Sequence, residues 1–137
     1  MELKDNELRI GNLFDHMDDG ILLIEEIKKD SDGFKGYYAV FRNGSIKCHV
    51  SYLQPIPLTE EWLLRFGFDK EHVTVNDIII NIYRLGDYEI SIYLQGNETQ
   101  KGYYLPHSLQ SRAYIKYVHQ LQNLYFSLTN NELKLIK

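Results

Sequence analysis

Alternation of apolar and polar residues predicts short strands through the first half of the chain. Four segments alternate in this way, at residues 8–14, 21–27, 37–42 and 46–50. Asn43 and Gly44 lie between the last two segments and favour a type I′ turn, because both central residues of that turn need a positive φ. Prolines 55 and 57 exclude a central strand but permit a barrel-closing edge strand. We therefore expect residues 1–58 to form a small SH3-like β-barrel.

A short helix and a three-stranded meander are predicted for the second half of the chain. Thr59 is a favourable N-cap, Glu60 and Glu61 place negative charge at the start of the helix, and Gly67 suits the left-handed residue that follows a helix end. Strand patterns then follow at residues 77–85, 88–94 and 101–105.

The apolar period changes to that of a helix between Tyr114 and Leu128. Its stripe consists of Tyr114, Val118, Leu121, Tyr125 and Leu128. We expect this helix to cover the sheet of the second half. Leu133 and Leu135 alternate with polar residues and predict a short terminal strand. The expected fold class is α+β, with a lobe at residues 1–58 and an α-β-β-β-α lobe at residues 59–137 in one compact unit.

Charge and composition narrow the class of protein. The chain has 137 residues, 19 of them acidic and 15 basic, and its net charge of -4 disfavours nucleic acid and anionic membranes. The longest apolar run is too short to cross a bilayer, and the first residues lack the apolar stretch of a secretion signal. Cys48 is the single cysteine and has no internal disulfide partner. We therefore expect a cytoplasmic protein.

Motifs for catalysis, metals or cofactors are missing from the sequence. Five histidines and one cysteine occur without the spacing of a metal site, and no glycine-rich phosphate loop is present. We expect no enzyme activity, no metal and no cofactor. An enzyme of another type stays open as an alternative, if Cys48, His49 or His107 meets an acidic residue in a cleft.

Three segments carry a resemblance to a known family. They are RIGNL at residues 9–13, PIPLTEEWLLRFGF at residues 55–68 and IKYVHQLQNLYFSLT at residues 115–129. Together they resemble a family of short uncharacterised proteins encoded by phages and mobile elements of gut anaerobic bacteria. The resemblance implies a viral or mobile-element origin and expression in the host cytoplasm. It implies no activity and assigns no site residue.

These observations favour a non-enzymatic binding protein whose partner is a host protein or a small signalling ligand. Tyrosine, present 11 times, is enriched at binding hot spots. The candidate interaction surface combines residues off the helical stripe with strand tyrosines, namely Lys116, His119, Gln120, Asn123, Tyr83, Tyr93 and Tyr103.

Two alternatives remain beside this expectation. The first is nucleic-acid binding by the SH3-like lobe, through a basic stripe formed by Lys28, Lys29, Lys35, Arg42 and Lys47. The second concerns assembly, since a short meander leaves sheet edges that suit a homodimer.

Overall fold

The computed structural model describes residues 8–29, 37–75, 77–85, 88–95, 102–104 and 114–136. The chain divides into two compact units. The first unit consists of Met1–Ile56 and Tyr117–Glu132, and the second of Pro57–Lys116 and Leu133–Lys137. The first boundary lies close to the one expected after residue 58, but the C-terminal helix belongs to the first unit.

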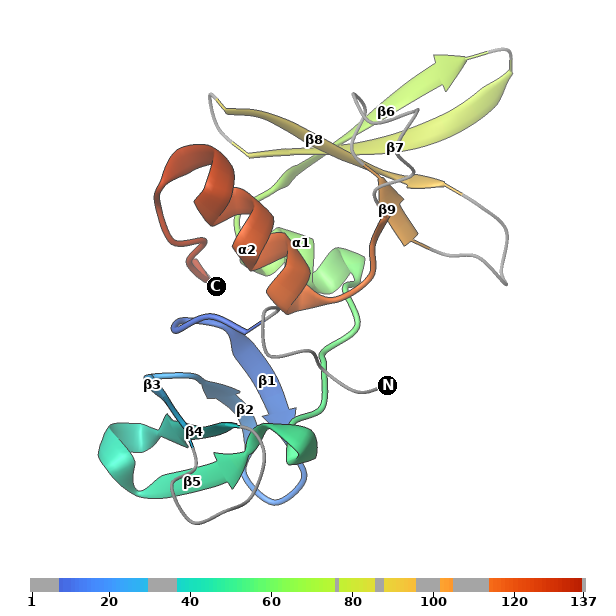
Figure 1. Cartoon of the computed structure of the whole chain (residues 1–137). Coiled ribbons are helices and arrows are strands. Elements are labelled where there is room, and N and C mark those ends of the chain that lie inside the picture. The colour runs from blue at the N-terminus through green and yellow to red at the C-terminus, as the bar shows by residue number, and fades with distance from the viewer. Residues whose placement is uncertain are drawn as a thin grey trace. The chain divides into compact units, whose positions relative to one another are not determined.

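Five strands of the first unit form two antiparallel sheets (Figure 1). One is the hairpin of β1 (Leu13–His16) and β2 (Gly20–Leu23), and the other has the order β3 (Glu26–Lys29), β4 (Tyr37–Phe41), β5 (Ile46–His49). The predicted second strand is therefore divided into β2 and β3. The Ile24 N–H donates to Asn12 O at 2.9 Å, and the next N–H, of Glu25, donates to Val40 O at 2.9 Å. The chain thus passes directly from one sheet to the other.

The predicted hairpin of β4 and β5 is confirmed, with Phe41 opposite Ile46. Its loop is longer than a two-residue turn, because a 3-10 helix (η2, Arg42–Gly44) lies between the strands. Arg42, Asn43 and Gly44 all have positive φ, at 48°, 57° and 89°. Asn43 and Gly44 therefore adopt the expected conformation, and Arg42 joins them. The Asn43 N–H donates to the Glu25 carboxylate at 2.7 Å, which ties the loop to the start of β3.

A second 3-10 helix (η3, Val50–Tyr52) follows β5 and returns the chain to β1. Beyond it, Gln54 and Asp15 exchange two backbone hydrogen bonds of 3.0 Å. The segment that contains the prolines therefore lies beside an edge strand, as its composition requires.

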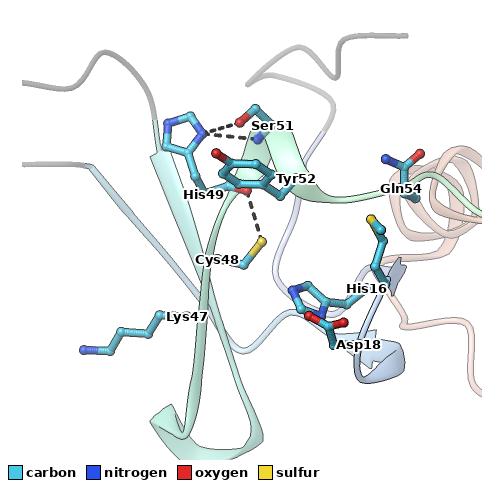
Figure 2. Close-up of a pocket in the computed structure, with 9 residues that line it drawn as sticks. His16, Asp18, Lys47, Cys48, His49, Ser51, Tyr52 and Gln54 are labelled. Atoms are coloured by element: carbon cyan, nitrogen blue, oxygen red, sulfur yellow. Dashed lines mark hydrogen bonds between the residues drawn. The ribbon is translucent and has the colours of Figure 1, made fainter.

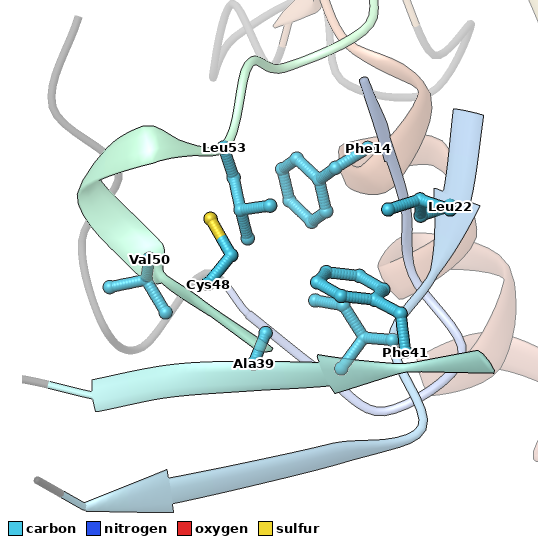
Figure 3. Packing of buried hydrophobic residues seen from close by; sticks show 8 residues of the cluster. Phe14, Leu22, Ala39, Phe41, Cys48, Val50 and Leu53 are labelled. Carbon is cyan, nitrogen blue, oxygen red and sulfur yellow. The ribbon is translucent and has the colours of Figure 1, made fainter. Parts of the chain in front are cut away.

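Apolar side chains from all these elements form the core of the first unit (Figure 3). Eight buried residues make up the cluster, namely Phe14, Leu22, Ile24, Ala39, Phe41, Cys48, Val50 and Leu53. The cluster draws on both sheets and on η3, so burial of apolar surface holds the two sheets together.

The C-terminal helix α2 (Val118–Thr129) begins four residues later than the pattern predicted. Tyr114 and Ile115 instead form strand β10, which pairs with β9 in the second unit. We expected α2 to cover the sheet of the second half, whereas the helix belongs to the first unit. Gln122, buried in α2, accepts a 2.9 Å hydrogen bond from Leu13 N–H and donates one of 3.0 Å to Gly11 O, which binds the helix to the start of β1.

The second unit begins with helix α1 (Glu60–Arg65), which ends as the sequence predicts. Gly67 has φ +96°, its N–H donates to Leu64 O, and the N–H of Phe68 donates to Leu63 O, both at 3.0 Å. These bonds form a Schellman motif.

A five-stranded antiparallel sheet follows α1 in the second unit. Its order is β10 (Tyr114–Ile115), β9 (Gly102–Tyr104), β8 (Tyr88–Gln95), β7 (Ile78–Leu85), β6 (Asp69–Val75). The predicted meander of β7, β8 and β9 is confirmed. Strand β6 was not predicted, because its sequence DKEHVTV is rich in charged residues.

The predicted terminal strand is not formed within residues 130–136. Ile136 instead donates its N–H to Arg65 O at 2.7 Å, at the end of α1. The fold is thus mixed α and β, with antiparallel strands in small open sheets and two α-helices, over the part of the chain that the structure describes.

Candidate functional site

A hollow with a volume of about 390 Å³ opens on the first unit, beside β5 (Figure 2). Three parts of the chain line it: the end of β1 with the β1–β2 turn, β5, and the segment from η3 to Gln54. We call it the β5 hollow. Its lining residues are His16, Met17, Asp18, Lys47, Cys48, His49, Ser51, Tyr52 and Gln54.

The β1–β2 turn forms one rim of the β5 hollow. Gly20 has φ +77°, which allows the chain to reverse within a few residues. His16 Nδ1 lies 3.1 Å from Asp19 Oδ2, and the Arg42 guanidinium donates to Asp19 O at 3.3 Å. These contacts fix the turn and leave Met17 with 87% of its surface exposed.

The 3-10 helix η3 contributes another part of the lining. His49 caps this helix, because its Nδ1 accepts a 3.3 Å hydrogen bond from Ser51 N–H and lies 2.8 Å from the Ser51 hydroxyl oxygen. In a neutral imidazole the other nitrogen, Nε2, then carries the proton. Tyr52 follows on the same helix and is 69% exposed. The imidazole ring of His49 and the exposed ring of Tyr52 thus both belong to this part of the lining.

Cys48 contributes the buried thiol of the β5 hollow. Its Sγ donates to His49 O at 3.2 Å, as Figure 2 shows. Burial raises the pKa of this thiol above its ordinary value, so the thiol stays protonated at neutral pH. Because the thiolate is the nucleophilic form, Cys48 is not activated for catalysis. Among the residues described, no group of three or more His, Cys, Asp or Glu side chains is placed to hold a metal ion.

His119, a candidate for the interaction surface because it lies off the helical stripe, is completely buried in the first unit. Its ring stacks on Phe14 at 4.9 Å and on Tyr117 at 5.8 Å between ring centroids. The expectation that it forms an interaction surface is therefore wrong. The reason is that the first turns of α2 are covered beyond the apolar stripe, since Gln122 is buried as well as Val118 and Leu121.

Gln120 and Asn123 lie in the same helix as His119, and each makes hydrogen bonds that stabilise the fold. Gln120 Oε1 accepts a 3.1 Å hydrogen bond from Tyr117 N–H and so caps the first turn. Asn123 Oδ1 accepts from Arg9 Nε at 3.1 Å and from Asn12 Nδ2 at 2.8 Å. Lys116, which precedes α2, is exposed. Of the four residues expected off the stripe, Lys116 alone is exposed.

The candidate tyrosines lie in the sheet of the second unit. Tyr83 is buried, and its hydroxyl donates to Glu60 Oε1 at 3.2 Å. The pKa of the Glu60 carboxyl is lowered from its ordinary value, mainly by the hydrogen bond with Lys70. Tyr93 lies in β8 and Tyr103 in β9, but their side chains are outside the part that the structure describes. The register pairs Tyr83 with Ile92, Tyr93 with Ile82 and Tyr103 with Leu94, so none of the three lies opposite another.

The basic residues considered for nucleic acid do not form an unbroken stripe. Lys28 lies 3.5 Å from the carboxylate of Glu26, and Glu26 and Lys47 are both cross-strand partners of Val40. An acidic side chain therefore stands among the cations. Lys35 lies outside the described residues, as does His107 from the enzyme alternative.

Sequence reasoning missed the β5 hollow because its lining residues come from three separate segments. Met17 lies in an acidic segment that resembles an ordinary solvated turn, and nothing in the local sequence places it near Tyr52.

No helix in the described part of the chain has the length and apolar character needed to cross a membrane. No protein-family model, curated protein or solved structure matches this chain.

Proposed function

We propose that this chain is a non-enzymatic binding protein of phage or mobile-element origin, and that the β5 hollow receives part of a host protein. The observation that carries the proposal is the hollow itself, which is lined by the exposed side chains of Met17 and Tyr52. Methionine adapts its shape to different partners, and tyrosine is enriched at binding hot spots. Large apolar side chains beside a hollow are suited to recognition of an apolar side chain.

The connection of the strands in the first unit supports a binding role by analogy. A hairpin, a three-stranded sheet, a 3-10 helix and a bridge back to β1 follow one another. We interpret this order as an SH3-like arrangement, in which the chain passes directly from β2 in one sheet to β3 in the other. Small barrels of this kind commonly serve as binding modules, although fold alone does not decide function.

A small signalling ligand is a second candidate occupant of the β5 hollow. Its volume of about 390 Å³ is in the range of small-molecule sites, about 300–1,000 Å³. Nucleic acid has weaker support, because Glu26 interrupts the basic residues and the net charge is -4. The lining residues also favour binding over catalysis, since the Cys48 thiol is protonated and His49 caps η3.

A pull-down experiment with site-directed variants of the chain tests the proposal. The lysate comes from a candidate host, a gut anaerobic bacterium. The tagged full chain should recover a partner that the double variant Met17→Ala/Tyr52→Ala loses, with affinity reduced by about 30-fold, as expected for a hot spot of about 2 kcal/mol. Leu64→Ala is the matched control, because Leu64 is an exposed apolar residue of the second unit. Equal recovery by the double variant would exclude the β5 hollow as the site. Native mass spectrometry of the same samples detects a small ligand instead.

A further inference from the structure

Strand β5 is the outermost strand of its sheet among the strands that the structure describes. It pairs with β4 on one side, and the β5 hollow adjoins it, since Lys47, Cys48 and His49 all line that hollow. The chain leaves β5 into η3 and meets β1 only later, at Gln54. The edge of β5 and the hollow are therefore neighbouring features of one surface.

The backbone of β5 directs its polar groups alternately toward β4 and away from it. Val40 O accepts the Glu25 N–H, so the backbone groups of Val40 face β3. In an antiparallel ladder successive residues face opposite sides, so Ala39 and Phe41 face β5. Their cross-strand partners are Cys48 and Ile46. It follows that the N–H and C=O of Lys47 face the outer edge of β5.

We infer that the partner binds as an extended segment that adds as a strand to the outer edge of β5. Its backbone pairs with the N–H and C=O of Lys47, and one of its apolar side chains enters the β5 hollow between Met17 and Tyr52. Strand addition of this kind takes affinity from the backbone bonds and specificity from pockets that receive alternate side chains. The inference rests on the function proposed above and specifies the form of the partner.

Charges beside the β5 hollow indicate which segment fits. Figure 2 shows Asp18 and Lys47 on opposite sides of the hollow, with Asp18 on the turn and Lys47 on β5. A segment is complementary if it carries a basic residue toward the turn and an acidic residue toward β5, on either side of its apolar anchor. Because both charges are solvent-accessible, salt should weaken this preference.

Selection from a library tests the inference without a known partner. A random 12-residue peptide library displayed on yeast is selected against the full chain, and the most enriched peptide is synthesised. We expect it to contain an apolar residue flanked by a basic and an acidic residue, and to slow hydrogen exchange of the Lys47 amide at least tenfold. Failure to enrich any peptide, or unchanged exchange at Lys47, would overturn strand addition.

Substitution of Lys47 separates backbone pairing from side-chain contact. Lys47→Pro removes the outward N–H, and proline is tolerated at strand edges, so the bonds between β4 and β5 should persist. We expect the selected peptide to bind Lys47→Pro about tenfold more weakly than Lys47→Ala, which keeps the backbone donor. Equal affinities would contradict the inference. If circular dichroism shows that Lys47→Pro does not fold, the exchange measurement on the unmodified chain decides.

The same peptide distinguishes this inference from the proposed function. Loss of binding in Met17→Ala/Tyr52→Ala, with Lys47→Pro binding as tightly as Lys47→Ala, would leave the β5 hollow as the site and exclude strand addition. Binding that none of these substitutions alters would exclude both.

Discussion

The side-chain oxygen of Asn123 accepts a 2.8 Å hydrogen bond from the amide of Asn12, which lies 111 residues earlier in the chain. The same oxygen accepts from Arg9, whose guanidinium also bonds Glu132 and lies 4.3 Å from the centre of the Phe126 ring. The segment RIGNL at residues 9–13 and helix α2 thus meet in the first unit. Their shared role is to hold α2 against the start of β1.

The first prediction concerns the Asn12–Asn123 bond. Asn12 is completely buried, so Asn12→Ala should lower the free energy of unfolding by about 1–3 kcal/mol, because Asn123 loses a donor and a small cavity forms. Urea denaturation measures the change. The double variant Asn12→Ala/Asn123→Ala should cost less than the sum of the two single variants, since each removes the same bond.

Ser127→Ala serves as the control for this cycle. The Ser127 hydroxyl is exposed and donates to Leu124 O within α2, so its loss should change stability by less than about 0.5 kcal/mol. Strict additivity of Asn12→Ala and Asn123→Ala would show that the two amides do not stabilise each other.

The second prediction concerns two glycines with positive φ. Gly11 has φ +96°, and an added Cβ would lie 3.2 Å from the carboxylate oxygens of Glu132. Gly20 has φ +77° but nothing within 4 Å of such a Cβ. Gly20→Ala should cost about 1 kcal/mol from backbone strain alone, and Gly11→Ala should cost more, because it also disturbs the ion pair of Glu132 with Arg9.

Thermal unfolding of the two variants provides the comparison for this prediction. The difference should shrink in the Glu132→Ala background, where the side chain that Gly11→Ala meets is removed. Equal costs for Gly11→Ala and Gly20→Ala in the unmodified chain would contradict the role assigned to that close approach.

Local chemistry determines which elements could be predicted from the sequence. The positive φ at Asn43 and Gly44 and the helix end at Gly67 depend on neighbouring residues, and both predictions are confirmed. Strand β10 depends on its pairing with β9, which the local sequence does not show. The apolar pattern therefore predicted a helix that begins too early and includes Tyr114 and Ile115. An apolar stripe predicts that a helix is buried but does not identify the surface that covers it. For that reason the stripe did not indicate that α2 packs within the first unit.

The candidate site was harder to predict for a related reason. A helical stripe treats polar residues as exposed, whereas Gln122 and Asn123 bond the backbone and side chains of residues 9–13. The β5 hollow depends on the return of the chain from η3 to β1, which lets Tyr52 and Met17 line the same hollow. Nothing within either segment predicts this meeting.

The third prediction separates a core histidine from an exposed lysine. His119→Ala should lower the free energy of unfolding by about 3 kcal/mol, because it leaves a cavity beside Phe14 and Tyr117. Lys116→Ala, at an exposed position, should change it by less than about 0.5 kcal/mol. Urea denaturation measures both. A His119→Ala variant as stable as the unmodified chain would contradict the packing described for the first unit.

The fourth prediction is the pH dependence of Cys48 alkylation. An unperturbed thiol has a pKa of about 8.5, and burial raises the pKa of Cys48. Iodoacetamide should therefore modify the folded chain more slowly than the unfolded chain at neutral pH, and the rate for the folded chain should keep rising beyond about pH 8.5, where that of an unperturbed thiol levels off. Since Cys48 is the only cysteine, the label reports this site alone.

The same shift of the Cys48 pKa determines the direction in which the free energy of unfolding changes with pH. Between the unfolded and the folded pKa the folded state holds more protons, so stability should fall as pH rises above about 8.5. Cys48→Ser removes this contribution and is the control in urea denaturation at each pH. Rapid alkylation of the folded chain at neutral pH would instead identify an activated thiolate. That result would replace a binding role for the β5 hollow with nucleophilic chemistry, because a thiolate beside His16 and His49 is a reactive group.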